Sequence, residues 1–316
     1  MRSSPPLALL FSALLAGCAS PIVPARAAPA PPVIPSTTQA NGFFAGTRGD
    51  WLFTQSWLPR TRERAVLVVV HGLKDHSSRY AGLAGSLGAR GIAVESFDLR
   101  GHGHSAGVRV DLESFGDYVD DLDLFVARVR TAHPNSPLFV LGHSMGGAIT
   151  TTYILKKRPP VQGFILSAPA IGFEKVGGAK IAATRVTASL FPSAGVFQLD
   201  TEKFSRDPAV VREAREDPLV HQPGAPARTA RELISALEYI DAHMEDVTTP
   251  FLALHGTADE VTEPAGSKAL HARARSTDKN LTLYPGLAHD LLHEPERARV
   301  TDDIAAWIEA RSKGHS

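Results

Sequence analysis

The sequence predicts an α/β fold in which helices cover both faces of a mostly parallel sheet. Two observations support this prediction. Short apolar runs rich in β-branched residues, typical of strands buried on both faces, alternate along the chain with segments that have the apolar spacing of helices. The alternation stops between residues 172 and 246, where helical pieces are interrupted by Gly and Pro. We therefore expect a core formed by residues 43–171 and 247–316, with residues 172–246 inserted as a helical cap.

The segment before this core has the composition of an export signal. After Arg2 comes a mostly apolar run of ten residues, 7–16, which is too short to span a ~30 Å hydrocarbon core as a helix. The run ends in Leu15-Ala16-Gly17-Cys18, which resembles the lipobox of bacterial lipoproteins, where the cysteine becomes the lipidated first residue. We expect residues 1–17 to be a signal peptide and Cys18 to anchor an exported protein to a membrane of the bacterial cell envelope. The alternative is a secretory signal with a chance cysteine.

Residues 18–42 are expected to form an extended tether. Six prolines stand between residues 19 and 40, among Ala, Ser and Thr and with almost no charge. Such a composition stiffens the chain and supplies too little apolar surface to build a core.

Six strands are expected in the core. They are predicted at residues 66–70, 92–97, 137–142, 161–166, 251–255 and 281–284. Helices are predicted at residues 77–90, 112–131 and 145–157, the first ending at Gly91 and the last before Pro159. Right-handed crossovers between parallel strands bring the carboxyl ends of the strands to one edge of the sheet, where ligands bind in such folds.

The segment Gly142-His143-Ser144-Met145-Gly146 has the pattern G-x-S-x-G and lies between a predicted strand and a predicted helix. In that context the two glycines allow a tight, strained turn that lifts a serine hydroxyl to the edge of the sheet. We therefore predict that Ser144 is a catalytic nucleophile. The alternative is a serine that caps the helix N-terminus.

A serine nucleophile needs a base, and on this type of scaffold an acid and then a histidine follow it in the chain. Asp259 stands after the fifth predicted strand and His289 after the sixth, so both are expected at the same edge as Ser144. We predict that Asp259, rather than the neighbouring Glu260, orients His289 as the general base. His293 lies four residues after His289, a spacing that a metal pair can use, but there is no H-E-x-x-H pattern and we expect no metal.

The negative charge that develops on an attacked carbonyl oxygen needs hydrogen-bond donors. These are commonly the amide after the nucleophile and an amide after an earlier strand. Here they are the backbone N–H groups of Met145 and Leu73, the latter following His71-Gly72. A simple turn that ends the strand is the alternative for His71-Gly72.

The composition excludes several functional classes. The 316 residues include 33 Lys and Arg and 33 Asp and Glu, so the net charge is zero, and no basic cluster marks a surface for nucleic acid. Cys18 is the single cysteine, which excludes an intrachain disulfide framework and Cys-rich zinc or iron–sulfur sites. The Gly-rich stretch 98–107 lacks the strand and helix frame of a phosphate-binding loop, so we expect a tight loop held by the side chains of Asp98 and Arg100.

Several stretches together resemble the monoacylglycerol lipases, a branch of the α/β-hydrolases close to lysophospholipases. They are HGLKDHSSRY (71–80), FDLRGHGHSAG (97–107), GHSMGG (142–147), DP at 207–208 and 217–218, HGTADEVT (255–262) and GLAHDLLHE (286–294), within a resemblance that runs from about residue 43 to 311. The resemblance implies an α/β-hydrolase fold, a triad of Ser144, Asp259 and His289, and an oxyanion hole formed by the amides of Leu73 and Met145. It also implies no cofactor and a cap that lines an acyl-chain tunnel. At Lys74-Asp75 the charge differs from the more usual pattern, in which Glu precedes the His-Ser pair.

These features predict a serine hydrolase that cleaves carboxylic esters of lipids, in the first place monoacylglycerols. A lysophospholipase or a short-chain carboxylesterase is the alternative in the same class, and a non-catalytic lipoprotein that uses the fold for binding is a third hypothesis. The cap stretch 176–199 carries eight apolar side chains, which would either face an acyl chain or pack on the core below. The expected partners are a lipid ester substrate and a membrane, and the oligomeric state is left open.

Overall fold

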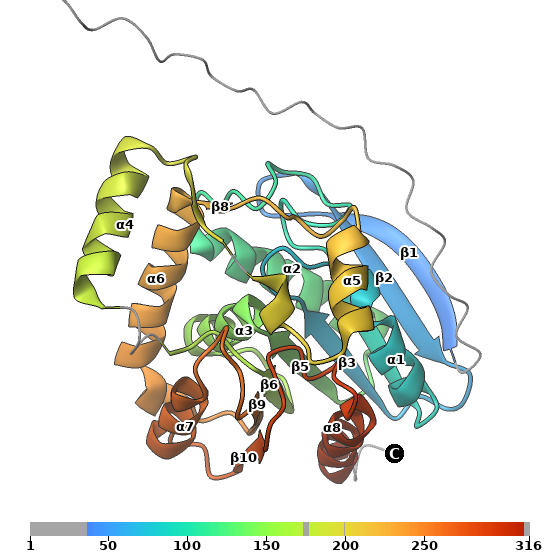
Figure 1. Cartoon of the computed structure of the whole chain (residues 1–316). Coiled ribbons are helices and arrows are strands. Elements are labelled where there is room, and N and C mark those ends of the chain that lie inside the picture. The colour runs from blue at the N-terminus through green and yellow to red at the C-terminus, as the bar shows by residue number, and fades with distance from the viewer. Residues whose placement is uncertain (1–36, 173–176, 199, 313–316) are drawn as a thin grey trace, which may run out of the picture.

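The computed structural model describes residues 37–172, 177–198 and 200–312 (Figure 1). The predicted signal peptide, Cys18 and the predicted tether up to residue 36 lie outside the described residues. The core is one sheet in the order β1-β2-β4-β3-β5-β6-β9-β10, and the last six strands of this order are parallel. These six are β4 (Ile92–Phe97), β3 (Ala65–Val70), β5 (Leu138–His143), β6 (Gly163–Ser167), β9 (Phe251–Gly256) and β10 (Lys279–Tyr284). They are the six predicted strands, with bounds shifted by at most two residues.

The edge of the sheet corrects the predicted tether. β1 (Thr37–Ala45) pairs antiparallel with β2 (Trp51–Pro59), which pairs antiparallel with β4. Residues 37–42 therefore belong to the sheet and not to a tether. The apolar pattern does not predict β1 because most side chains of this edge strand are exposed or half-buried, and no apolar run precedes Phe43.

Helices cover both faces of the sheet because its central strands are apolar on both sides. The core helices are η1 (Ser77–Tyr80), α1 (Ala81–Gly88), α2 (Phe115–Ala132), α3 (Met145–Lys157), α7 (Pro264–Arg273) and α8 (Arg297–Ser312). Along β3, Val66 and Val68 face the apolar cluster built with α2 and α3, whereas Leu67 and Val69 face the cluster built with α1 and α8. Figure 1 shows these two pairs of helices on opposite sides of the sheet. Each fully buried side chain of this kind contributes roughly 1.5–3 kcal/mol, so the two clusters fix the strands in place.

The segment between β6 and β9 is largely helical and forms a cap. It consists of α4 (Gly178–Leu190), β7 (Gly195–Phe197), η2 (Thr201–Lys203), α5 (Pro208–Glu216), β8 (Ala225–Pro226), α6 (Ala227–Ala242) and η3 (Met244–Asp246). Helix α6 packs against both α4 and α3 and so joins the cap to the core. Val186, Leu190 and Phe191 are more than half exposed, so they neither pack on the core nor face a tunnel, in contrast to both interpretations of the apolar stretch. Within the described residues, no helix combines the length and the apolar content needed to cross a membrane.

Candidate active site

Ser144 occupies a strained turn between β5 and α3. Its φ is 54° and its ψ is −121°, a backbone conformation that residues other than glycine rarely adopt and that costs on the order of 1–3 kcal/mol. The two glycines of the motif make the turn possible. A Cβ on Gly142 would lie 2.6 Å from the carbonyl carbon of Gly146, and one on Gly146 would lie 2.6 Å from the carbonyl oxygen of His71. Because helix, turn and strand approach so closely, the serine side chain stands at the edge of the sheet.

Backbone hydrogen bonds hold this turn in its strained conformation. The Ser144 N–H donates to the carbonyl oxygen of Ser167 at 3.1 Å. The Ser144 carbonyl oxygen accepts from the N–H groups of Gly147 and Ala170, each at 2.9 Å. The strain is therefore balanced by the backbone on both sides, and the side chain is left to face a pocket.

Asp259 is the anchor of the site, in the loop after β9. One carboxylate oxygen accepts the N–H groups of Val261 and Thr262, at 2.7 and 2.9 Å. The other accepts from the Thr262 hydroxyl at 2.8 Å, from His289 Nδ1 at 2.8 Å and from His255 Nε2 at 3.1 Å. Burial by itself would raise the pKa of Asp259, but the hydrogen bonds from His255 and His289 hold that pKa well below its usual range. The ionised carboxylate therefore fixes His289 with its proton on Nδ1, which leaves Nε2 free to accept one.

His289 lies in the loop after β10, and the rings of two other residues pack against its imidazole. The ring of His143 lies 4.9 Å away between centroids, and the ring of Phe204, from the cap, lies 5.6 Å away. Among the described residues, no hydrogen bond joins the Ser144 hydroxyl to His289, so the structure forms the Asp259–His289 contact and not the second contact of the predicted triad. Such catalytic hydrogen bonds often tighten only when substrate is bound.

Two backbone amides beside Ser144 are unpaired. Neither the N–H of Leu73 nor that of Met145 donates to an acceptor in the described part of the chain. Both residues line the same pocket as Ser144. These are the two amides that the sequence predicts for an oxyanion hole.

The ring of His71 orients one of these amides. Its Nε2 accepts from the N–H of Leu99 at 2.9 Å, so the proton is on Nδ1, which donates to the carbonyl oxygen of Gly72 at 2.8 Å. That carbonyl and the Leu73 N–H belong to one planar peptide unit and point in opposite directions. His71 is therefore a positioning residue for the Leu73 amide.

The pocket beside Ser144 has a volume of about 180 Å³ and lies between the cap and the edge of the sheet. Most of its walls are apolar. The cap contributes Ala230, Leu233, Ile234 and Leu237 from α6 and Lys180 and Thr184 from α4, and the core adds Ala170, Gly172, Val261, Thr262 and Glu263. A ligand bound here would contact Ser144 and the apolar side chains of α6.

Comparison with known proteins agrees with this arrangement. Residues 61–296 match the model of the serine aminopeptidase S33 family. The chain belongs to this family. Over 274 residues it is 38% identical to the monoacylglycerol lipase of Mycolicibacterium smegmatis, which covers 86% of this chain and 98% of that protein. It is 29% identical to the phospholipase YtpA of Bacillus subtilis, over 78% of this chain and 96% of that protein.

A solved structure places the S33 family member among the α/β-hydrolases. The crystal structure of the Paleococcus ferrophilus monoacylglycerol lipase superposes with a TM-score of 0.74 at 29% identity, and covers 82% of this chain and 99% of that one. The predicted α/β-hydrolase fold and the resemblance to monoacylglycerol lipases are thus confirmed.

Three residues of the site in this S33 family member do not follow from the motifs. Thr262 stands three residues after Asp259, a spacing at which an aspartate commonly binds the following backbone, so its role could have been read from the sequence. His255 and Phe204 reach the site from the end of β9 and from the cap. His255 stands four residues before Asp259, in the stretch 255–262 that carries the resemblance, so the sequence holds a local signal for it. The position of Phe204 depends on how the cap packs on the core, and the sequence carries no signal for that residue.

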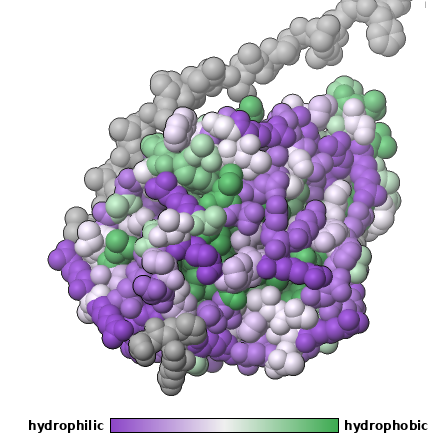
Figure 2. All heavy atoms as spheres, turned by 180° about the vertical axis from the view of Figure 1, so that it is seen from behind, coloured by the Kyte–Doolittle hydropathy of each residue, from purple (hydrophilic) through white to green (hydrophobic). Residues whose placement is uncertain are grey.

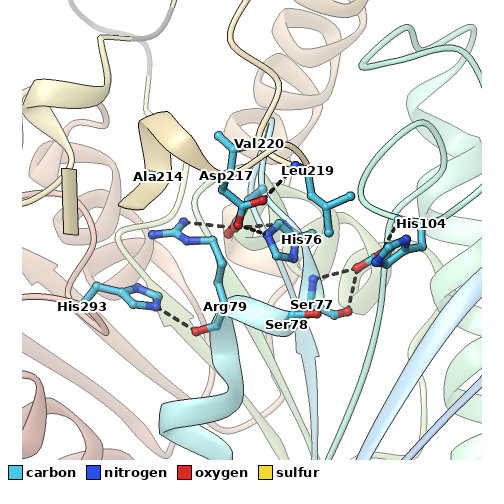
Figure 3. Close-up of polar contacts among 12 residues, drawn as sticks. His76, Ser77, Ser78, Arg79, His104, Ala214, Asp217, Leu219, Val220 and His293 are labelled. Atoms are coloured by element: carbon cyan, nitrogen blue, oxygen red, sulfur yellow. Dashed lines mark hydrogen bonds and ion pairs between the residues drawn. The ribbon is translucent and has the colours of Figure 1, made fainter. Parts of the chain in front are cut away.

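The residues weighed as alternatives are engaged elsewhere. Glu260 pairs with Lys203 at 2.7 Å on the surface, while Asp259 contacts the imidazole. His293 binds Asp290 through Nδ1 at 2.7 Å. Its Nε2 binds the Arg79 carbonyl oxygen at 2.8 Å, as Figure 3 shows. In the described residues no group of three or more potential metal ligands gathers.

The Gly-rich loop 98–107 is tight and held as its side chains predict. Asp98 accepts from the N–H groups of Ser77 and His104, both at 2.7 Å. Arg100 pairs with the buried Asp121 at 3.0 Å. Asp98 thereby joins the loop to η1, and the Leu99 N–H donates to His71, so the loop supports the segment that carries Leu73.

Proposed function

We propose that this protein is a serine hydrolase that cleaves the ester bond of monoacylglycerols through an acyl-enzyme on Ser144. The observation that carries the proposal is a strained serine with two unpaired amides at one pocket, together with an imidazole that a buried carboxylate orients and that contacts the ring of His143, next to the serine. A protein that only binds lipid needs none of these groups in this order. The non-catalytic hypothesis is therefore the weakest of the three.

The geometry supports a two-step acyl transfer. In the first step His289 Nε2 accepts the Ser144 proton while the hydroxyl oxygen attacks the ester carbonyl carbon, and Asp259 stabilises the imidazolium. The amides of Leu73 and Met145 donate to the oxygen that becomes negative, and one such donor is worth about 10²–10³ in rate.

The imidazolium then returns the proton to the leaving alcohol. The ester C–O bond breaks, the acyl group stays on Ser144 and glycerol leaves with the proton from His289. A water molecule that His289 deprotonates attacks the acyl-enzyme in the second step and releases the fatty acid.

A lipid substrate is supported by the pocket and by the outer surface of the cap. The apolar wall of α6 would stabilise an acyl chain by about 0.8 kcal/mol for each buried CH₂. Val186, Leu190, Phe191 and Val196 are between 46% and 67% exposed. Figure 2 shows hydrophobic residues at the upper right, where the turned view places the end of α4. Such a surface favours contact with aggregated lipid.

Substitution of the nucleophile tests the proposal. Ser144→Ala should reduce kcat for a monoacylglycerol by at least ~10³-fold, as loss of a triad member does in serine hydrolases. Ser86→Ala, on α1 and away from the pocket, is the matched control and should leave kcat unchanged. Full hydrolysis by Ser144→Ala would overturn the triad.

The same class contains a second candidate, because the phospholipase YtpA is among the relatives of this chain. Rates over a series of acyl lengths and headgroups separate the candidates. A monoacylglycerol lipase should favour esters of C10 and longer with a glycerol headgroup. If acetyl esters react faster than long-chain esters, the protein is a short-chain carboxylesterase and the lipase proposal fails.

We further propose that the protein is exported and held on a membrane of the bacterial cell envelope through lipid on Cys18. The support is the apolar run followed by Leu-Ala-Gly-Cys, with the single cysteine at the position that lipidation requires. Cells that express the protein should incorporate labelled fatty acid into it, and Cys18→Ser should abolish the label while Ser20→Ala retains it. An unlabelled wild-type protein would refute the anchor.

A further inference from the structure

His255, at the end of β9, is a second imidazole bound to the carboxylate that orients His289. Its Nε2 lies 3.1 Å from Oδ2 of Asp259, and the same oxygen accepts from His289 Nδ1 at 2.8 Å. The side chains of His255 and Asp259 are both fully buried. A catalytic triad uses one imidazole on its carboxylate, and the steps of acyl transfer require no second one.

Ser267 fixes the protonation of the His255 ring. Its hydroxyl, in the first turn of α7, is buried and lies 2.8 Å from His255 Nδ1. An ionised carboxylate only accepts hydrogen bonds, so the proton is on His255 Nε2, which donates to Asp259. In the neutral ring Nδ1 then accepts from the Ser267 hydroxyl. A chain of donors thus runs from Ser267 through His255 to Asp259.

Hydrogen bonds stabilise the charge of Asp259. In the described part of the chain no lysine or arginine pairs with this carboxylate, and its side-chain partners are His255, His289 and Thr262. Burial alone would raise the pKa of Asp259, and the hydrogen bond from His255 lowers that pKa most, ahead of the one from His289. His255 therefore takes a large share of the negative charge that Asp259 would otherwise direct at His289.

The other charged groups near His289 are bound elsewhere. Asp290, the next residue, pairs with Arg79 of η1 at 2.8 Å and with His293 at 2.7 Å. On the side of β5 lies the ring of His143, and because burial lowers its pKa to about 4 this ring is uncharged at neutral pH. The carboxylate bonded to His289 therefore governs how strongly that ring holds a proton.

We propose that His255 is a positioning residue that weakens the hold of Asp259 on the protonated general base, so that His289 can still accept the Ser144 proton at lower pH. The inference rests on the proposed function, because Asp259 and His289 act in that reaction. A hydrogen bond to a carboxylate oxygen draws negative charge toward its donor, which leaves less charge to stabilise an imidazolium on the same oxygen. The same effect favours the step in which the imidazolium passes its proton to the leaving alcohol.

This role separates the effect of His255 on pH dependence from any effect on substrate binding. His255 does not line the pocket beside Ser144, and it gives and takes no proton in the reaction. Its loss should therefore leave KM nearly unchanged and act on kcat and on the pH dependence of kcat/KM. A residue that only filled space at the end of β9 would change the stability and not the pH dependence.

The test follows kcat/KM for 1-octanoylglycerol against pH, below the micelle concentration of the ester, on the purified full chain. His255→Leu removes the donor, and the acidic limb of the profile should move up by about 0.5 to 1 pH unit. His255→Gln keeps an N–H group for Asp259 and should keep the limb at its wild-type position. His271→Leu, on α7 with its ring against Phe251, is the matched control and should also leave the limb unchanged.

Two further measurements keep the outcome decisive. His255→Asn keeps a polar side chain beside Ser267 but is too short to reach Asp259, so it should show the shift even if His255→Leu does not fold. The pH at which His289 is half protonated, read from the ¹⁵N NMR signals of its ring nitrogens, should rise in the variants that lose the donor. This reading needs no activity.

The outcomes distinguish the inference from the proposed function. If the wild type cleaves the ester, and neither the acidic limb nor the NMR midpoint of His289 differs between wild type and the His255 variants, the inference is wrong and the proposed function stands. If the wild type does not cleave the ester, the proposed function fails. The NMR midpoints then decide the inference by themselves, since equal midpoints overturn it and a rise in His255→Leu and His255→Asn alone supports it.

Discussion

At the carboxyl ends of the strands, His102 and His143 are buried and donate from Nδ1 to backbone carbonyl oxygens. Burial lowers the pKa of His102 to about 3 and that of His143 to about 4. His133, at the end of α2, is also largely buried but lies against the carboxylates of Glu63 and Glu95, at 2.9 and 3.2 Å. The hydrogen bonds that the imidazole donates to these two carboxylates raise its pKa to about 9. Buried histidines are thus neutral near the candidate site, where they donate to backbone carbonyl oxygens, and cationic at the end of α2, where the ring donates to two carboxylates.

His289 combines the two environments. It has a carboxylate partner in Asp259, as His133 has in Glu63, and it has the neutral ring of His143 beside it. A ring in this position can gain a proton during the reaction, because the carboxylate favours the cation and no standing charge on His143 opposes it. The comparison therefore teaches that the site needs both a carboxylate on one side of the imidazole and uncharged neighbours on the other.

The largest expected effect comes from removing that carboxylate's charge. In Asp259→Asn the amide no longer stabilises the imidazolium that forms during the reaction, and it no longer selects the tautomer of His289. We expect kcat for a monoacylglycerol to fall about 10⁴-fold, as the same change does in a serine protease. Steady-state kinetics at saturating ester measure this, with Asp302→Asn on the exposed face of α8 as the control. A loss below tenfold would mean that Asp259 does not orient the base.

The strands and the positions of the candidate site residues could be predicted from the sequence for a local reason. Buried parallel strands are continuous apolar runs, and Ser144, Asp259 and His289 each stand just after one, so pattern and chain order suffice to place them at one edge. β1 has no such run, and its pairing with β2 is a tertiary property. The contact of His255 with Asp259 is local, since the two residues are four apart at the end of β9, but an apolar run that predicts a strand does not show that its last histidine turns toward the carboxylate.

Two further features could not be predicted from the sequence, for the same physical reason. They are the exposure of the apolar face of α4 and the burial of Lys74, whose Nζ has no hydrogen-bond partner among the described residues. Helical spacing shows that apolar residues share a face, but not whether anything covers that face, and Leu190 is 67% exposed. A lysine in a loop is ordinarily solvated, and only the fold shows that Lys74 is buried beneath the cap segment of His221.

The close packing at the carboxyl edge gives the next largest effect. A Cβ on Gly146 would press on the backbone of β3, which cannot move without disturbing the sheet, so Gly146→Ala should reduce the free energy of unfolding by about 3 kcal/mol. Gly82→Ala is the matched control, because a Cβ there meets nothing within 4 Å and α1 should gain up to about 1 kcal/mol. Urea unfolding measures both. Equal stability of the two variants would contradict the packing argument.

A fall in pH should destabilise the folded protein through its buried neutral histidines. The pKa of His102 in the folded protein is about 3, below the value of about 6.5 in an unfolded chain, so the unfolded state binds more protons between these values. The contribution of neutral His102 to the free energy of unfolding is therefore complete above about pH 6.5 and is lost as the pH falls toward 3. His102→Gln should therefore lose roughly 2.5 kcal/mol less stability than wild type between pH 6 and pH 4. Urea unfolding at the two pH values decides this, and equal losses in the two proteins would show that His102 is not buried in its neutral form.

The smallest effect, and the one with opposite sign, is expected at His133. Because its pKa of about 9 in the folded protein lies above the unfolded value, its contribution is complete below about pH 6.5 and is lost as the pH rises through 9. His133→Gln keeps a hydrogen-bond donor but removes the charge, and should reduce the free energy of unfolding by about 2 kcal/mol at pH 6 and by little at pH 10. Unfolding of both proteins by urea at the two pH values gives the difference. If the variant is equally destabilised at both, His133 acts through packing, and the contrast between the two histidine environments would not be one of charge.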